Sequence, residues 1–110
     1  MLLDAHEGKI SEAIDTATSG DNILVNNDNE SWIYVHEIIG SAASAVTVQF
    51  LAGSRLLAEF ALDAGQGLTA DDIPGDDGVP RFKCKPSEDF IMNLSGAVQF
   101  TGSIVYSRRY

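Results

Sequence analysis

Hydrophobic and polar residues alternate strictly near the C-terminal end of the chain. One face of the repeat is formed by Val98, Phe100, Gly102, Ile104 and Tyr106. A period of two over this length is typical of a β-strand with one buried face. The segment FIMNL (90–94) repeats the pattern, with Phe90, Met92 and Leu94 on one side. Because Ser95-Gly96-Ala97 is the only obvious turn between the two, we expect residues 90–108 to form a β-hairpin.

Similar alternation occurs upstream. The segment RFKCK (81–85) places Phe82 and Cys84 on one face and its three basic residues on the other. The segment AVTVQFLA (45–52) also alternates, and the dipeptide Gly53-Ser54 follows it. The next segment, RLLAEFAL (55–62), contains good helix formers, but the short turn before it favours a second strand paired as a hairpin.

The middle of the chain contains a further strand pattern. SWIYVHEIIG (31–40) is rich in β-branched and aromatic residues, which indicates a core strand. Ile33 and Val35 share a face, but Ile38-Ile39 breaks the alternation, so we expect a β-bulge near His36-Glu37. NILVN (22–26) is a short strand candidate. The segment 9–18 is compatible with a helix, but its β-branched residues and the Ser19–Asn22 turn favour an edge strand.

These patterns predict eight or nine strands separated by turns rich in Gly, Asn, Asp and Ser. The expected fold class is all-β: an antiparallel β-sandwich or small jelly roll. A chain of 110 residues is long enough to bury a core as one domain without disulfides or metals. We expect residues 1–20 to form an N-terminal arm or edge strand and residues 21–110 to form the β-sandwich domain.

The charge is strongly acidic and unevenly distributed. The net charge of −9 argues against general nucleic-acid binding, which depends on Lys and Arg at phosphates. Residues 1–80 contain 14 acids and two bases, whereas residues 81–110 contain five bases and two acids. This asymmetry is compatible with chance, or with charge complementarity between copies or with a larger partner.

The remaining global features predict a cytosolically folded protein. The N-terminal residues MLLDAHEGKIS have no basic segment followed by an apolar one, so we expect no signal peptide. No apolar run reaches the roughly 18 residues of a membrane span, so we expect no membrane partner. The single cysteine, Cys84, cannot form an intrachain disulfide, which fits folding in a reducing cytosol.

Two polar stretches are candidates for ligand sites. DDIPGDDG (71–78) holds Asp71, Asp72, Asp76 and Asp77 around a Pro-Gly turn. Calcium binds clustered carboxylates, but this spacing does not match the EF-hand loop, so a solvated turn is the stronger interpretation and calcium or a partner contact the alternative. The stretch 26–30 (NNDNE) is typical of a plain loop, because Asn and Asp bond their own backbone and tolerate left-handed conformations.

Catalytic chemistry has weak candidates. Nucleophilic catalysis requires a base beside the nucleophile, and His6 and His36 are the only histidines. Cys84 is most simply a small core residue, and a Cys84–His36 dyad would require a fold that the pattern does not indicate. We therefore expect no enzymatic activity, no catalytic residues and no cofactor.

Interface candidates are stronger. Trp32 and Tyr34 share one strand face, which is compatible with core or subunit-interface packing and also with stacking on a sugar, where Tyr106 and Tyr110 could contribute. The basic residues Arg81, Lys83 and Lys85 also share one strand face. They would either protect an edge strand from aggregation or form a docking stripe for an acidic neighbour.

The region from residue 30 to the C-terminus resembles small β-sandwich proteins encoded among the structural genes of tailed bacteriophages. The resemblance rests on a strand pair around a short Gly/Ser turn, the Gly-rich segment DAGQGL (63–68) before an acidic loop, and a C-terminal motif. The motif residues are Asn93, Leu94, Ser95, Val98, Gly102, Ile104 and Tyr106. The acidic loop is longer than the family pattern has it, so no role is carried over to that loop.

This resemblance implies a virion protein, most specifically a capsid decoration (cement) protein. Such a protein would form homotrimers and dock on the major capsid protein at the capsid surface. A carbohydrate-binding or calcium-dependent adhesion module of a phage tail or fibre is the alternative.

Overall fold

The computed structural model describes residues 8–71 and 80–109, and the described part is built of β-strands alone. Nine strands occur there: β1 (Lys9–Thr16), β2 (Gly20–Val25), β3 (Trp32–Ala42), β4 (Val46–Ala52), β5 (Arg55–Leu62), β6 (Gly67–Ala70), β7 (Phe82–Cys84), β8 (Phe90–Leu94) and β9 (Phe100–Arg109). The all-β prediction is confirmed.

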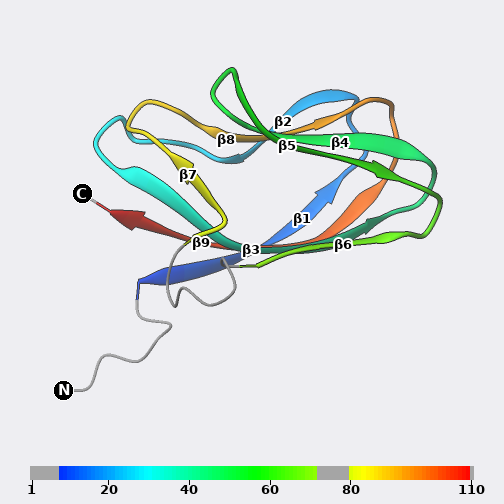
Figure 1. Ribbon diagram of the computed structural model, residues 1–110, viewed down its shortest axis with the longest axis horizontal. Helices are drawn as coiled ribbons and strands as arrows, with labels where there is room; N and C mark the ends of the chain where they lie inside the picture. The colour runs from blue at the N-terminus through cyan, green and yellow to red at the C-terminus, as the bar shows by residue number, and fades with distance from the viewer. Residues whose placement is uncertain (1–7, 72–79, 110) are drawn as a thin grey trace.

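The strands form two antiparallel sheets that pack face to face (Figure 1). One sheet has the order β1-β9-β3-β6, and β7 pairs with the same edge of β3 as β6. The other sheet has the order β2-β8-β4-β5. Strands that follow one another in the chain often belong to different sheets. This order of strands in the two sheets is that of a jelly roll. The more specific of the two expected architectures is therefore present.

The predicted hairpin of residues 90–108 is wrong. β8 pairs with β2 and β4, whereas β9 pairs with β1 and β3 in the opposite sheet. The connecting segment is bonded at both ends to the β3–β4 region, through Ser95 N to Thr47 O at 3.0 Å and Ala43 N to Gln99 O at 2.9 Å. Alternation predicts which face of a strand is buried but not which strand it pairs with.

Other local predictions are confirmed. β4 and β5 pair as a hairpin across Gly53-Ser54, and Gly53 adopts a left-handed φ of 61°. The pairing of β3 with β9 shifts register between Val35 and Glu37, which places the expected bulge at His36. Residues 9–16 form an edge strand that pairs with β9 along its whole length.

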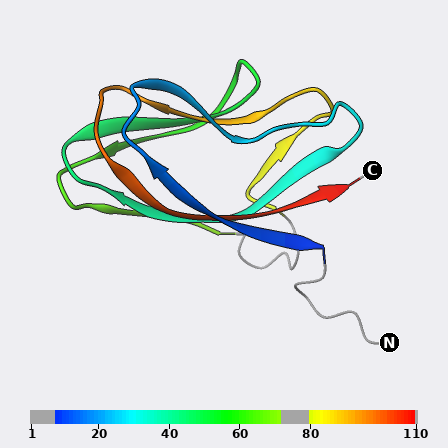
Figure 2. The ribbon, with the colours of Figure 1, turned by 180° about the vertical axis from the view of Figure 1, so that it is seen from behind.

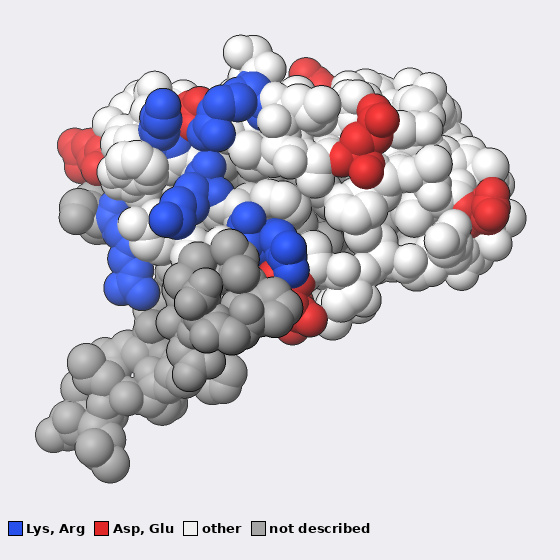
Figure 3. All heavy atoms as spheres, viewed as in Figure 1, with Lys and Arg blue, Asp and Glu red and all other residues white. Residues whose placement is uncertain are grey.

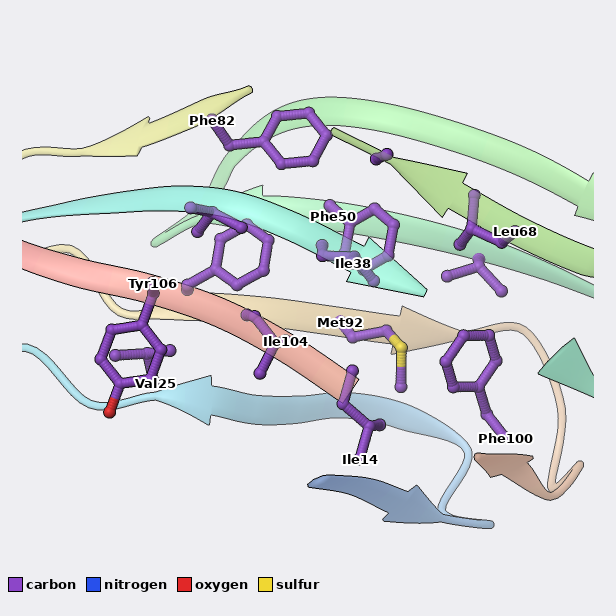
Figure 4. Packing of buried hydrophobic residues seen from close by; sticks show 14 of the residues in the cluster. Ile14, Val25, Ile38, Phe50, Leu68, Phe82, Met92, Phe100, Ile104 and Tyr106 are labelled. Carbon is purple, nitrogen blue, oxygen red and sulfur yellow. The ribbon is translucent and has the colours of Figure 1, made fainter. Parts of the chain in front are cut away.

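The core lies between the two sheets. Phe50, Phe90, Met92 and Leu94 project from one sheet, and the other contributes a matching set. That set includes Ile33, Val35, Ile38, Phe100 and Ile104, all buried. Figure 4 shows five of these side chains meeting between the ribbons of the two sheets: Ile38, Phe50, Met92, Phe100 and Ile104. Burial of large apolar side chains is the main stabilising contribution.

Candidate interaction surface

One long edge of the sandwich is open and forms a groove. Its volume is about 680 Å³, and it runs between β5 of one sheet and β6 and β7 of the other. The apolar part of the lining consists of Leu57, Ala58, Phe60, Ala70, Pro80 and Phe82. The basic part consists of Arg55, Arg81 and Lys83. The combination is an apolar floor with a basic rim.

The floor exists because β5 is the last strand of its sheet. Phe60 lies opposite Val48 in the β4–β5 ladder and points towards the core, yet no further strand of the described chain covers it, so it stays partly exposed. Its ring meets Phe50 edge to face, with centroids 6.0 Å apart. Phe82, from β7, packs against Phe50 and Phe90 at 5.8 and 5.9 Å. The groove therefore exposes the margin of the aromatic core.

The basic rim is held by a small polar network. Arg55 Nη2 donates to Glu88 Oε1 at 2.9 Å and lies 3.4 Å from the Lys83 carbonyl oxygen. Glu88 Oε1 also accepts the backbone N–H of Lys85 at 2.7 Å. These contacts, the Arg55 hydrogen bond first, lower the pKa of the Glu88 carboxyl, and the same bond raises the pKa of Arg55. On the other side, Arg81 Nε donates to the Asp71 carbonyl at 2.6 Å.

The NNDNE loop supports this end of the molecule, as its composition predicts. Asn27 Nδ2 donates to the carbonyls of Ser31, Lys85 and Glu88 at 3.0–3.1 Å. Asp28 Oδ1 accepts the N–H groups of Glu30 and Ser31. Asn29 adopts a left-handed φ of 68°. The loop thereby fixes the turn that carries Lys85 and Glu88.

The predicted interface residues lie at the same end of the fold. Tyr34 pairs with Lys83 across β3 and β7, and the Lys83 ammonium lies 5.7 Å from the Tyr34 ring centroid, a cation–π contact. Trp32 pairs with Arg109 across β3 and β9 and is 39% exposed. Lys85 follows β7 and is exposed. The structure thus joins the aromatic pair and the basic stripe, which the sequence presented as separate features.

The basic side chains are concentrated on this end. Figure 3 shows the visible Lys and Arg side chains gathered on one part of this face, with a few acids beside them and others scattered over the rest. The single ion pair within residues 8–71 and 80–109 is Arg55–Glu88. Lys83, Lys85 and Arg109 therefore have no carboxylate partner in the described part of the chain, and their charge is available to a partner molecule.

Tyr106 does not extend the aromatic pair. It is buried at the inner side of β9, and its hydroxyl donates to Glu12 Oε1 at 3.1 Å. Burial, followed by this hydrogen bond, raises its pKa. Tyr110 lies outside the described residues. A four-residue sugar platform is therefore not assembled from the residues that the structure describes.

The catalytic candidates are placed as core residues. Cys84 is fully buried, and burial raises the pKa of its thiol to about 12, so it is protonated at neutral pH. His36 is buried, and its Nε2 lies 2.9 Å from Ser107 Oγ. That pair was not predicted, because 71 positions separate the two residues in sequence. His6 lies outside the described residues.

The acidic stretch falls mostly outside the description. Asp71 is exposed, whereas Asp72, Asp76 and Asp77 belong to residues 72–79, so the calcium alternative stays a prediction. Residues 8–71 and 80–109 contain no group of three or more side chains suited to holding a metal ion. The same residues contain no helix long and apolar enough to cross a membrane.

Comparisons with known proteins show a structural likeness and no family. No protein-family model and no curated protein matches the sequence. A solved structure of Bacillus endospore appendages, described as disulfide-linked pili, is similar with a TM-score of 0.51 and 15% identity over 93% of this chain and 85% of that one. The Tobacco streak virus coat protein matches with a TM-score of 0.39 and 11% identity over 93% and 88%. At 15% identity, the first match shows a likeness of fold and nothing more.

Proposed function

We propose that the chain is a structural protein of a bacteriophage virion, and specifically a capsid decoration (cement) protein that binds copies of itself and the major capsid protein. The observation that carries this proposal is the open groove with its basic rim, beside an exposed aromatic and basic sheet face. The groove exposes part of the aromatic core, and basic side chains beside it have no carboxylate partner in the described chain. Both features are typical of a protein–protein interface. The resemblance of residues 30–110 to phage structural proteins supplies the virion context.

In this function the chain stabilises a shell without catalysing a reaction. Added contacts between shell subunits oppose the outward pressure of packaged DNA. The fold likeness to an appendage subunit is compatible with this role, since that protein forms pili. Cys84 and His36, the strongest catalytic candidates, serve the core: the thiol is protonated and both side chains are buried.

We assign capsid docking to the outer sheet face that carries Trp32, Lys83, Lys85 and Arg109. The test is cosedimentation of the purified chain with heads of its phage that lack it. We expect saturable binding and a higher temperature for DNA release from the decorated heads. The double variant Trp32→Ala/Lys85→Glu should bind at least about tenfold more weakly. Binding to tails and not to heads would contradict the decoration role.

Host-glycan binding is a second candidate because Trp32 is exposed next to Arg109. Tyr34 is a poorer stacking surface, since the Lys83 ammonium lies over its ring. A glycan array separates the two functions. Binding to one sugar class that is lost in Trp32→Ala would favour the adhesion module, whereas an array without binding would favour decoration.

A further inference from the structure

The sandwich has two opposite long edges, each made of one strand or strand pair from either sheet. We call the edge of β5, β6 and β7 the basic edge and the edge of β1 and β2 the acidic edge. Figure 1 is viewed from the side of the basic edge, and Figure 2 from the side of the acidic edge. Within the described chain, the outer sides of β5 and β1 pair with no strand. Both therefore present backbone donors and acceptors to a partner.

The basic edge exposes apolar side chains beside positive charge. Leu56 is 55% exposed, and Leu57 and Phe60 are partly exposed in or beside the groove. Arg81 and Lys83 line the same groove with no ion pair in the described chain, and Arg55 lines it while paired with Glu88. β5 is eight residues long and contains one acid, Glu59, whose side chain accepts a hydrogen bond from Gln49. A long, apolar free edge of this kind promotes association with another strand.

The acidic edge has the complementary composition. Ile10 and Ile23 are 41% and 55% exposed. The acids of this edge are Glu12, Asp15 and Asp21, and the one base on its two strands is Lys9. Each acid accepts a hydrogen bond from a neutral group, namely Tyr106 Oη, Gln99 Nε2 and Asn93 Nδ2. Their negative charge is therefore not neutralised by a cation of the described chain.

We propose that the acidic edge of one copy docks on the basic edge of the next, with β1 adding to β5 and the exposed isoleucines covering the apolar groove. This inference rests on the proposed self-association and specifies its geometry. Strand addition would supply main-chain hydrogen bonds, and the opposite charges would fix the orientation. Pairing two basic edges or two acidic edges would bring like charges together, so the charges select the front-to-back arrangement.

An interface of this kind is heterologous, because two different surfaces of the same chain meet. Successive copies then form a ring if the rotation between them closes and a filament if it does not. The homotrimer expected from the sequence resemblance would be a closed ring of three such contacts. An isologous dimer would not use this contact.

Charge reversal on each edge tests the proposal. The basic-edge variant is Arg81→Glu/Lys83→Glu, and the acidic-edge variant is Glu12→Lys/Asp15→Lys. In each, the two meeting edges carry the same sign, so we expect the association constant to fall at least about tenfold by light scattering after size exclusion. Combining all four substitutions in one chain restores opposite signs at every contact and should restore the assembly.

The matched control is Lys85→Glu/Arg109→Glu, which makes the same change in net charge at the same end but outside the groove lining. It should assemble as the wild type does, and circular dichroism should show every variant folded. Loss of assembly in the control as well, or failure of the chain with all four substitutions to assemble, would overturn the edge pairing.

Two further outcomes separate this inference from the proposed function. An oligomer that is unchanged by all reversals overturns the edge pairing and leaves the decoration role standing. A wild-type chain that is monomeric and still binds heads also overturns the edge pairing and leaves the decoration role standing. A basic-edge reversal that changes the melting temperature and leaves the mass unchanged also overturns the proposal.

Discussion

At the scale of single residues, the pairing of β3 with β9 brings two backbones close together at Gly40 and Gly102. The two glycines are register partners. A Cβ on Gly102 would lie 1.9 Å from the Ile39 carbonyl oxygen, and one on Gly40 would lie 2.6 Å from the Phe100 ring. Gly102 occupies a position in the alternating series that would otherwise hold a larger core residue. Glycine is required at this position because the two backbones approach too closely for a side chain.

Replacing Gly102 by alanine should therefore overpack this crossing. We expect Gly102→Ala to lower the free energy of unfolding by about 1–3 kcal/mol, measured by urea denaturation. The control is Gly96→Ala, because a Cβ at Gly96 meets no heavy atom within 4 Å. Equal unfolding midpoints for the two variants would contradict the packing described.

The Cys84 thiol should be unreactive in the folded protein. It is fully buried and its pKa is raised to about 12, so almost no thiolate forms at pH 8. A disulfide-exchange reagent should modify the chain only after addition of urea, when one thiol per chain becomes reactive. Rapid modification of the native protein would show that the β7 side of the core opens readily.

The Glu88 carboxylate should make stability depend on pH. Its pKa in the folded protein is lowered, so the unfolded chain binds a proton first as the pH falls. The stabilisation is complete above the ordinary carboxyl pKa and is lost as the pH drops below it. We expect Glu88→Gln to lower the free energy of unfolding slightly at pH 7, because an ion pair in contact with water contributes little, and not at all once wild-type Glu88 is protonated. A constant difference at all pH values would contradict this account.

At the scale of elements, residue patterns predict where strands occur, but they predict poorly which strands pair with one another. Eight of the nine strands, the His36 bulge and the β4–β5 hairpin follow from alternation and from turn residues close in sequence. β6 was not predicted, because its first residues belong to the Gly-rich segment 63–68 and it is only four residues long. The pairing of β8 and β9 does not, because it is decided by contacts with β2, β4, β1 and β3, which are distant in sequence. The groove was missed for the same reason: it forms where β5 lies opposite β6 and β7.

For the site residues, features within one strand were predictable from the sequence, whereas contacts between strands were not. The Arg81, Lys83 and Lys85 stripe was visible within one strand, but its contact with Tyr34 depends on the β3–β7 register. The position of Glu88 beside Arg55 depends on two turns 33 residues apart. Such juxtapositions carry no local signal in the sequence.

β1 should be the least protected strand of its sheet in the unassembled chain. Only Ile14 of its eight residues is buried, and its outer side pairs with no described strand. We expect its amides to exchange with deuterium faster than those of β9 and β3, which lie inside the sheet. Assembly through the acidic edge should then slow exchange in β1 and β5. Unchanged exchange in both strands on assembly would contradict their pairing.

At the scale of the whole molecule, the net charge of −9 conceals two differently charged edges. The basic edge carries Arg55, Arg81 and Lys83, and the acidic edge carries Glu12, Asp15 and Asp21. Because salt screens such surface charges, an assembly formed through them should weaken as the ionic strength rises.

The most direct test is the solution mass of the wild-type chain, measured by light scattering after size exclusion at low and at moderate salt. The account predicts a multiple of 11.8 kDa at low salt, near three times that mass for a closed trimer, and partial dissociation at moderate salt. A mass of 11.8 kDa at every concentration and at both salt levels would contradict self-association.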